Sequence, residues 1–207
     1  MKNQIIPSII AKNQKELNER FEKVKSLSNV FHLDIMDGKF VKNRSLMFDF
    51  KIPKNKNYIA HLMVENPENW INKNWRKADT IIFHFEATKN PGSVISLIKS
   101  KKRKVGIAIN PKTQVNKIGA YLKYVNIILI MTVNPGRYGA KFLPNILKKV
   151  KQLRKLKKSL DIRVDGGINP GTIRSASRAG ADSFIVGSYF QKADEVKKVL
   201  RELKDKF

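Results

Sequence analysis

The chain contains no cysteine among its 207 residues and only three histidines. Without cysteine it has no disulfide framework and no thiolate chemistry, and it suits a reducing compartment. No apolar run approaches the ~18 residues of a membrane span, and the first residues show no signal-peptide pattern. These absences predict a soluble, cytoplasmic protein without a membrane partner.

Acidic residues are scarce as well: 17 Asp and Glu stand against 42 Lys and Arg, and the formal net charge is +25 at pH 7. A charge of this size favours contact with polyanions. The basic residues, however, recur on nearly every predicted helix and in the loops between them. This distribution indicates solvated faces and no specific nucleic-acid reader, although non-specific adhesion to polyanions is expected.

What the chain does have is a regular alternation of strand-like and helix-like segments, without a linker or low-complexity stretch. The run at 126–133 is almost wholly apolar, as a parallel strand buried on both faces should be. Eight such alternations predict an α/β fold, a single (β/α)8 TIM barrel over residues 1–207. Residues 40–57 show little helical periodicity and are expected to form a long connection. The expected strands cover 4–10, 32–38, 58–64, 80–86, 105–110, 126–133, 162–165 and 183–186. The expected helices cover 14–26, 114–124, 145–158 and 170–179, with others from Pro67 and Pro91 and a last one capped by Asp194.

Side chains capable of chemistry recur near the ends of three expected strands. The run at 32–38 alternates His, Asp and Met with apolar residues, the run at 58–64 repeats the His-x-Met alternation, and a third strand ends in Asp165. Each residue alone is more often an ordinary core or turn residue. Together they fall at the carboxyl ends of barrel strands, where active sites of this fold lie. The predicted ligands of a divalent metal, Zn2+ or Fe2+ before Mn2+ or Co2+, are His32, Asp34, His61 and Asp165.

Glycines follow the last three expected strands. A single glycine is more often part of a turn, but glycines in three consecutive loops let backbone N–H groups face an anion. The sequence therefore predicts a phosphate site around Gly136, Gly139, Gly166, Gly167, Gly187 and Ser188.

Seven short motifs then occur in order: PSI at 7–9, HLDIMDGKFV at 32–41, HLMV at 61–64, HFEA at 84–87, MTVNPG at 131–136, VDGG at 164–167 and VGS at 186–188. Through them the chain resembles the ribulose-phosphate 3-epimerase family over nearly its full length. The resemblance implies a barrel enzyme that interconverts D-ribulose 5-phosphate and D-xylulose 5-phosphate, and a homo-oligomer.

The resemblance also implies roles for individual residues. Asp34 and Asp165 would be both metal ligands and the acid/base pair, since inverting C3 requires removal of a proton from one side and return of one to the other. The metal would polarise the C2 carbonyl and stabilise a cis-enediolate. Asp37 is expected to anchor a loop. The implied substrate contacts are Ser8, Met36, His61, Met63, Met131, Gly136, Arg137, Tyr138, Gly139, Asp165, Gly166, Gly167, Gly187 and Ser188.

Methionines 36, 63 and 131 resemble the family's collar over the intermediate; the alternative is that they fill gaps in the core.

The chain departs from the family pattern at several positions. Residues 135–140 lack a glycine and the glutamine of the usual phosphate loop, Ile59 and Arg163 replace acidic residues, and Lys42 replaces a proline. We expect Ile59 and Arg163 to lie one layer below the metal. Arg137 either pairs with the substrate phosphate or is one more surface cation.

Two alternative functions stay open at this point: epimerisation of a six-carbon ketose phosphate such as allulose 6-phosphate, and polyanion binding on the same scaffold.

Overall fold

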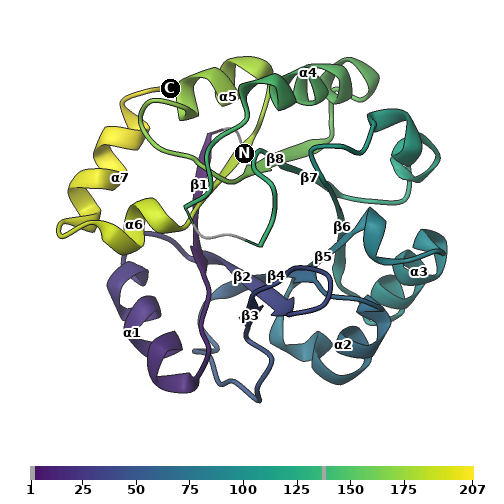
Figure 1. The fold of residues 1–207 in the computed structure, drawn as a ribbon, viewed down its shortest axis with the longest axis horizontal. Coiled ribbons are helices and arrows are strands. Elements are labelled where there is room, and N and C mark those ends of the chain that lie inside the picture. The colour runs from purple at the N-terminus through teal and green to yellow at the C-terminus, as the bar shows by residue number, and fades with distance from the viewer. Residues whose placement is uncertain (1–2, 137–138) are drawn as a thin grey trace.

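The computed structural model describes residues 3–136 and 139–207. The barrel strands are β1 (Gln4–Ile9), β2 (Val30–Asp37), β4 (Asn57–Met63), β5 (Thr80–His84), β6 (Lys104–Ile109), β7 (Ile127–Met131), β8 (Asp161–Asp165) and β9 (Ser183–Val186). They pair in parallel in the order β1-β9-β8-β7-β6-β5-β4-β2, and the pairing of β1 with β2 closes the ring. Figure 1 shows this ring with the helices outside it. The predicted TIM barrel is confirmed.

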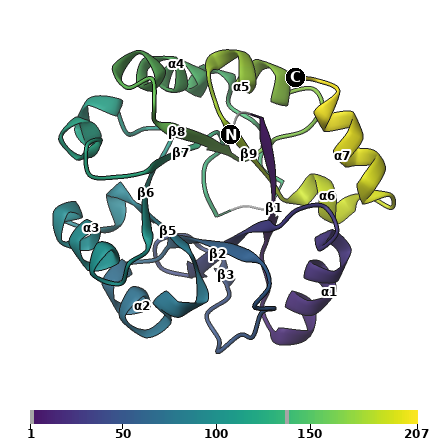
Figure 2. The same ribbon diagram turned by 180° about the vertical axis from the view of Figure 1, so that it is seen from behind.

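The helices cover the outer face of the barrel, as Figure 2 shows from behind. The α-helices are α1 (Gln14–Val24), α2 (Pro67–Asn74), α3 (Pro91–Ser100), α4 (Leu147–Leu156), α5 (Ile173–Ala179), α6 (Ser188–Lys192) and α7 (Val196–Lys204). Short 3-10 helices are η1 (Trp75–Lys77), η2 (Phe85–Ala87), η3 (Val115–Tyr121) and η4 (Pro144–Ile146). None of the helices in 3–136 and 139–207 has the length and apolar character needed to cross a membrane.

The predicted α-helix at 114–124 is wrong: Val115–Tyr121 form the 3-10 helix η3. Its buried residues, Val115 and Ile118, are three apart, which matches the three residues per turn of a 3-10 helix. Gly119 also lowers the α-helical propensity of the segment, at a cost of ~1 kcal/mol relative to alanine.

Several other predicted boundaries shift: the helix predicted at 14–26 ends at Val24, the strand predicted at 126–133 covers Ile127–Met131, and the helix predicted at 145–158 covers Leu147–Leu156. Three further corrections concern the strand at 80–86, the helix from 170 and the last helix. The strand predicted at 80–86 ends at His84, where η2 begins, and the helix predicted from 170 begins at Ile173. The side chain of Asn169 accepts a hydrogen bond from the N–H of Gly171 at 2.8 Å and holds those residues in a turn. Asp194 does not cap the last helix: Glu195 is at the cap position, and no side chain in the described chain caps that end. The helix starts after both acidic residues because its apolar stripe, which packs on the core, begins at Val196.

The long connection predicted at 40–57 contains the two-residue strand β3 (Arg44–Ser45), which pairs antiparallel with the end of β2. The hydroxyl of Ser45 accepts a hydrogen bond from the N–H of Ala11 at 3.0 Å, and the N–H of Leu46 donates to the carbonyl of Ala11 at 2.8 Å. These bonds tie the connection to the end of β1. They hold the first part of the loop over one end of the barrel.

The two larger parts of the core lie on opposite faces of the sheet. Outward-facing side chains such as Phe31, Leu33 and Ile35 of β2 pack against the helices. Inward-facing side chains fill the barrel: Ile6, Ile59, Ile82, Ala108, Ile127, Leu129, Met131 and Ile185. Because this apolar cluster fills the interior, a polar site is restricted to the layers near the carboxyl ends of the strands.

Candidate metal centre and active site

Four polar side chains meet at the carboxyl ends of β2, β4 and β8. Asp34 lies opposite His61 in the β2–β4 register, which places the two side chains side by side. The Oδ1 atom of Asp34 is 3.0 Å from Nδ1 of His61 and 3.2 Å from Nε2 of His32. Asp165 approaches from β8, with Oδ2 3.5 Å from His61 Nδ1 and 3.6 Å from His32 Nε2. One ligand atom from each of the four residues lies within 4.8 Å of the others.

The cluster is buried, and burial together with the neighbouring groups sets the charges of its members. His32 and His61 are completely shielded from solvent. Burial lowers the pKa of His61 to about 3, against the raising effect of its hydrogen bond to Asp34, so its imidazole is neutral at pH 7. Burial and the adjacent Asp34 raise the pKa of Asp165 to about 7. Burial also acts to raise the pKa of Asp34, but the neighbouring imidazoles outweigh it and hold this pKa below its ordinary range.

These features fit a divalent cation. Neutral imidazole nitrogens and carboxylate oxygens are the ligands of zinc and of the other borderline first-row metals. Two carboxyls in one buried cluster disfavour each other's ionisation, and a cation between them would remove that cost. Thus His32, Asp34, His61 and Asp165 form a cluster that could hold a metal.

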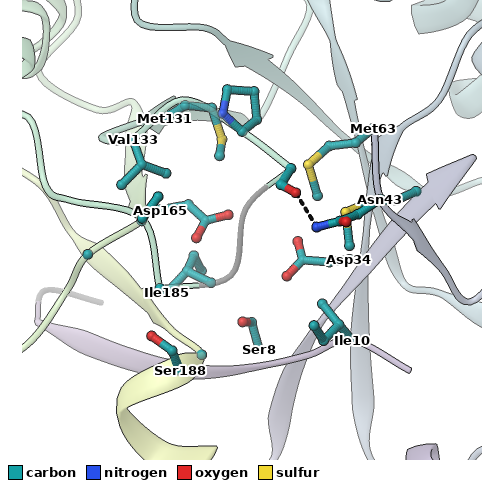
Figure 3. Close-up of a pocket in the computed structure, with 18 of the residues that line it drawn as sticks. Ser8, Ile10, Asp34, Asn43, Met63, Met131, Val133, Asp165, Ile185 and Ser188 are labelled. Carbon is teal, nitrogen blue, oxygen red and sulfur yellow. Dashed lines mark hydrogen bonds between the residues drawn. The ribbon is translucent and has the colours of Figure 1, made fainter. Parts of the chain in front are cut away.

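Asp34 and Asp165 of this cluster line a pocket (Figure 3). The carboxylates of Asp34 and Asp165 face each other across it, with Ser8 and Ser188 on one side and Met63 and Met131 on the other. The predicted site residues that line it are Ser8, Asp34, Met36, Met63, Met131, Gly136, Gly139, Asp165, Gly166, Gly167, Gly187 and Ser188. His61, a predicted substrate contact, does not line the pocket, and both His61 and His32 are fully buried. Arg137 and Tyr138 are outside the described residues.

The three methionines divide into two environments. Met36 and Met63 pack with Val41, and Ile10 and Phe40 lie against the same cluster. Met131 belongs instead to the apolar cluster inside the barrel. All three side chains nevertheless line the pocket. Core filling therefore describes part of what Met131 does, whereas the collar over the intermediate stays a prediction.

Loop anchoring by Asp37 is confirmed. Its Oδ1 accepts hydrogen bonds from the N–H groups of Lys39 at 2.8 Å and Phe40 at 3.0 Å, and its Oδ2 accepts one from Glu65 at 2.8 Å. These contacts fix the start of the loop that covers the pocket.

The structure adds residues that sequence reasoning did not assign to the site. The Asn43 side chain lines the pocket and donates a hydrogen bond to the carbonyl oxygen of Gly136, marked by the dashed line in Figure 3. Nothing in the local pattern around Asn43 signals this contact, because the partner lies far away in the chain. His84, the third histidine, contacts His61; its place at the end of a strand, two residues before Glu86, was the available signal.

Arg163 and Ile59, which replace acidic residues of the family pattern, lie one layer below the cluster. Its Nη2 and Nε atoms donate to Asp161 Oδ2 at 2.7 and 3.1 Å, and Ile59 belongs to the apolar interior cluster. Within the described chain, Nδ1 of His32 and Nη1 of Arg163 have no hydrogen-bond partner. The pairing of Arg163 with a residue of its own strand explains how a cation is tolerated in this layer.

Comparison with known proteins shows the family of the chain. Residues 4–191 match the Ribulose-phosphate 3 epimerase family. A ribulose-phosphate 3-epimerase of Eremothecium gossypii is 36% identical over 97% of this chain and 91% of its own length. One of Methanocaldococcus jannaschii is 36% identical over 96% and 88%. Among solved structures, a 3-hexulose-6-phosphate synthase shares the barrel with a TM-score of 0.70 at 14% identity, with complete coverage of both chains. The chain therefore belongs to the ribulose-phosphate 3-epimerase family, an enzyme family of carbohydrate metabolism.

Proposed function

We propose that this chain interconverts D-ribulose 5-phosphate and D-xylulose 5-phosphate at a divalent-metal site, with Asp34 and Asp165 as the acid/base pair. The observation that carries the proposal is the position of the two carboxylates, which face each other across the pocket from β2 and β8. A planar intermediate held between them exposes each of its faces to a different carboxylate. That arrangement is what inversion of a single carbon requires.

The proton steps follow from this arrangement. One aspartate removes the proton from C3, and the electron pair of the C–H bond moves toward the C2 carbonyl to form an enediolate. The other aspartate then donates a proton to the opposite face of C3, which restores the ketose with inverted configuration. A cation held by His32, Asp34, His61 and Asp165 would supply Lewis-acid stabilisation of the charge on the C2 oxygen. Methionines 36 and 63 exclude water from the reacting carbon.

Metal removal and refilling test the proposed reaction. Chelation should abolish turnover of ribulose 5-phosphate, and refilling with Zn2+, Fe2+, Mn2+ or Co2+ one at a time should identify the ion that restores it. Turnover that persists in protein shown to be metal-free would contradict the proposal. Faster turnover of allulose 6-phosphate under the same conditions would favour the six-carbon alternative.

The substrate phosphate is proposed to rest on the glycine loops after β8 and β9. Gly166 has φ of +113°, and Gly167 has φ of +67°. A Cβ at Gly166 would lie 2.7 Å from Cγ1 and 2.9 Å from Cβ of Val133, so only glycine lets this loop lie against the loop after β7. Backbone N–H groups presented there can bind an anion without a charged side chain.

Gly166→Ala should therefore weaken phosphate binding. Because a charge-assisted hydrogen bond contributes ~1.5–3 kcal/mol, loss of one should raise the KM for ribulose 5-phosphate by about 10- to 150-fold. Gly119→Ala is the matched control, since nothing lies within 4 Å of a Cβ at that position. Steady-state kinetics of both variants check the prediction; an unchanged KM in Gly166→Ala would remove this loop from the phosphate site.

Several further predictions belong with the proposed function. A relative from Oryza sativa subsp. japonica, 34% identical over 97% of this chain and 92% of its own length, is named a cytoplasmic isoform, which supports a cytoplasmic location. The homo-oligomer and the single domain over 1–207 stay predictions that sedimentation and limited proteolysis can test.

Non-specific polyanion binding would appear as a salt-sensitive gel shift of RNA or DNA.

A further inference from the structure

Two further polar side chains extend from His61 of the proposed metal site: His84 at the end of β5 and Glu86 in η2, which follows it. His84 is fully buried at the end of β5, and Glu86 lies in η2 with 23% of its side chain exposed. Strands β4 and β5 are neighbours in the barrel. His61 lies opposite Ile82 in their register, so His84 is one inward-facing position further along.

The three side chains His61, His84 and Glu86 form a continuous series of hydrogen-bond contacts. Nε2 of His84 is 2.9 Å from Nε2 of His61, and Nδ1 of His84 is 3.4 Å from Oε2 of Glu86. The two imidazole planes are inclined by only 21°, with centroids 5.0 Å apart, so the rings meet edge to edge through their nitrogens. Phe40 covers His84, its ring centroid 4.8 Å away. The nitrogen of His61 that faces the metal cluster is the other one, Nδ1.

The positions of the protons in this series of contacts decide whether His61 can bind a metal. A neutral imidazole carries one proton, and a nitrogen that binds a metal carries none. If Nδ1 of His61 is the ligand, its proton is on Nε2 and must be donated to His84. The proton of His84 is then on Nδ1 and points to Glu86, whose carboxylate can only accept. The opposite arrangement would require a protonated Glu86.

Glu86 is itself held as an acceptor. Its Oε1 accepts hydrogen bonds from the N–H of Asn110, at 2.8 Å, and from the hydroxyl of Thr113. Lys149 donates to the carbonyl oxygens of Asn110, Pro111 and Thr113 at 3.0, 2.6 and 2.5 Å and so fixes this segment. Burial acts to raise the pKa of Glu86, but hydrogen bonds from His84, Thr113 and Asn110 hold it below its ordinary value.

We propose that Glu86 and His84 are positioning residues that orient His61 and hold it in the tautomer that presents a bare Nδ1 to the metal. The inference rests on the proposed metal site. It also separates the two histidine ligands: within the described chain, His32 has no hydrogen-bond partner for Nδ1, whereas His61 is supported through two further side chains. Mutation of a hydrogen-bond partner of a metal ligand typically lowers metal affinity or activity about 10- to 100-fold.

The test measures Co2+ binding to the chelated protein by competition with a chromophoric chelator. Glu86→Gln should raise the Kd about tenfold, and His84→Phe between about 10- and 100-fold. His84→Gln should lose less Co2+ affinity than His84→Phe, because an amide oxygen can still accept a hydrogen bond from Nε2–H of His61. Glu65→Gln, which removes the same charge after β4, is the control and should leave the Kd within about twofold.

Two readouts distinguish this inference from the proposed function. The absorption bands of bound Co2+ should shift in Glu86→Gln while the thermal unfolding of the chelated protein changes little. If His84→Phe does not fold, Glu86→Gln still decides the question, because its side chain keeps nearly the same shape. Wild-type affinity in Glu86→Gln and in every folded His84 variant would overturn the inference alone. Failure of the wild-type chain to bind Co2+ would overturn the metal site and the inference together.

Discussion

Asp34→Asn and Asp165→Asn are each expected to lower kcat for epimerisation by about 100- to 10,000-fold, the usual contribution of a positioned acid or base. The loss is large because each carboxylate is proposed to serve one face of C3 and also to bind the metal. An amide retains the size of the side chain but cannot accept the proton from C3. Asp49→Asn is the matched control: the side chain of Asp49 is 90% exposed and forms an ion pair with Lys77, so the loss of its charge should change kcat/KM less than about twofold.

Solvent deuterium exchange separates the two roles of these aspartates. A variant that keeps one working base should still exchange the C3 proton of the epimer whose hydrogen faces that base. Exchange should therefore survive from one epimer in Asp34→Asn and from the other epimer in Asp165→Asn, provided that metal content is retained. Near wild-type turnover in either variant would remove that residue from the mechanism.

His61→Ala is expected to give the second large effect, a loss of bound metal together with activity. The substitution deletes a ligand and breaks the contact with His84 at 2.9 Å. Metal Kd should rise more than 100-fold, since changes at outer partners alone reach about that size. Elemental analysis and metal titration of the purified protein check this.

A control is needed because His61 is completely buried and its truncation leaves a cavity. His61→Gln fills more of the space, and circular dichroism of the chelated proteins shows whether each variant folds. Full metal occupancy in a folded variant would mean that the ligand set is wrong. Loss of metal with an unchanged fold would support the set of His32, Asp34, His61 and Asp165.

Much of the active end of the barrel follows from the sequence for a geometrical reason. In a strand, residues two apart point to the same face, so His32, Asp34 and Met36 had to share one face of β2. In a parallel barrel all strands end at the same rim, so His61 of β4 and Asp165 of β8 had to meet them there. Burial of the alternate residues against helices selects the inward face. Strand period and strand direction are local properties, and the sequence carries both.

Only the tertiary structure decided features that depend on register and on distant partners. The contact of His84 with His61 depends on how β5 is aligned with β4, and the bond from Asn43 to Gly136 joins residues 93 positions apart. Arg163 was expected below the metal, but its partner could not be named until the chain placed Asp161 beside it. The 3-10 form of Val115–Tyr121 depends on packing that overrides weak helical propensity. Sequence alone therefore determined the barrel and the residues that reach its rim, whereas strand register and loop packing decided which of those residues hold one another in place.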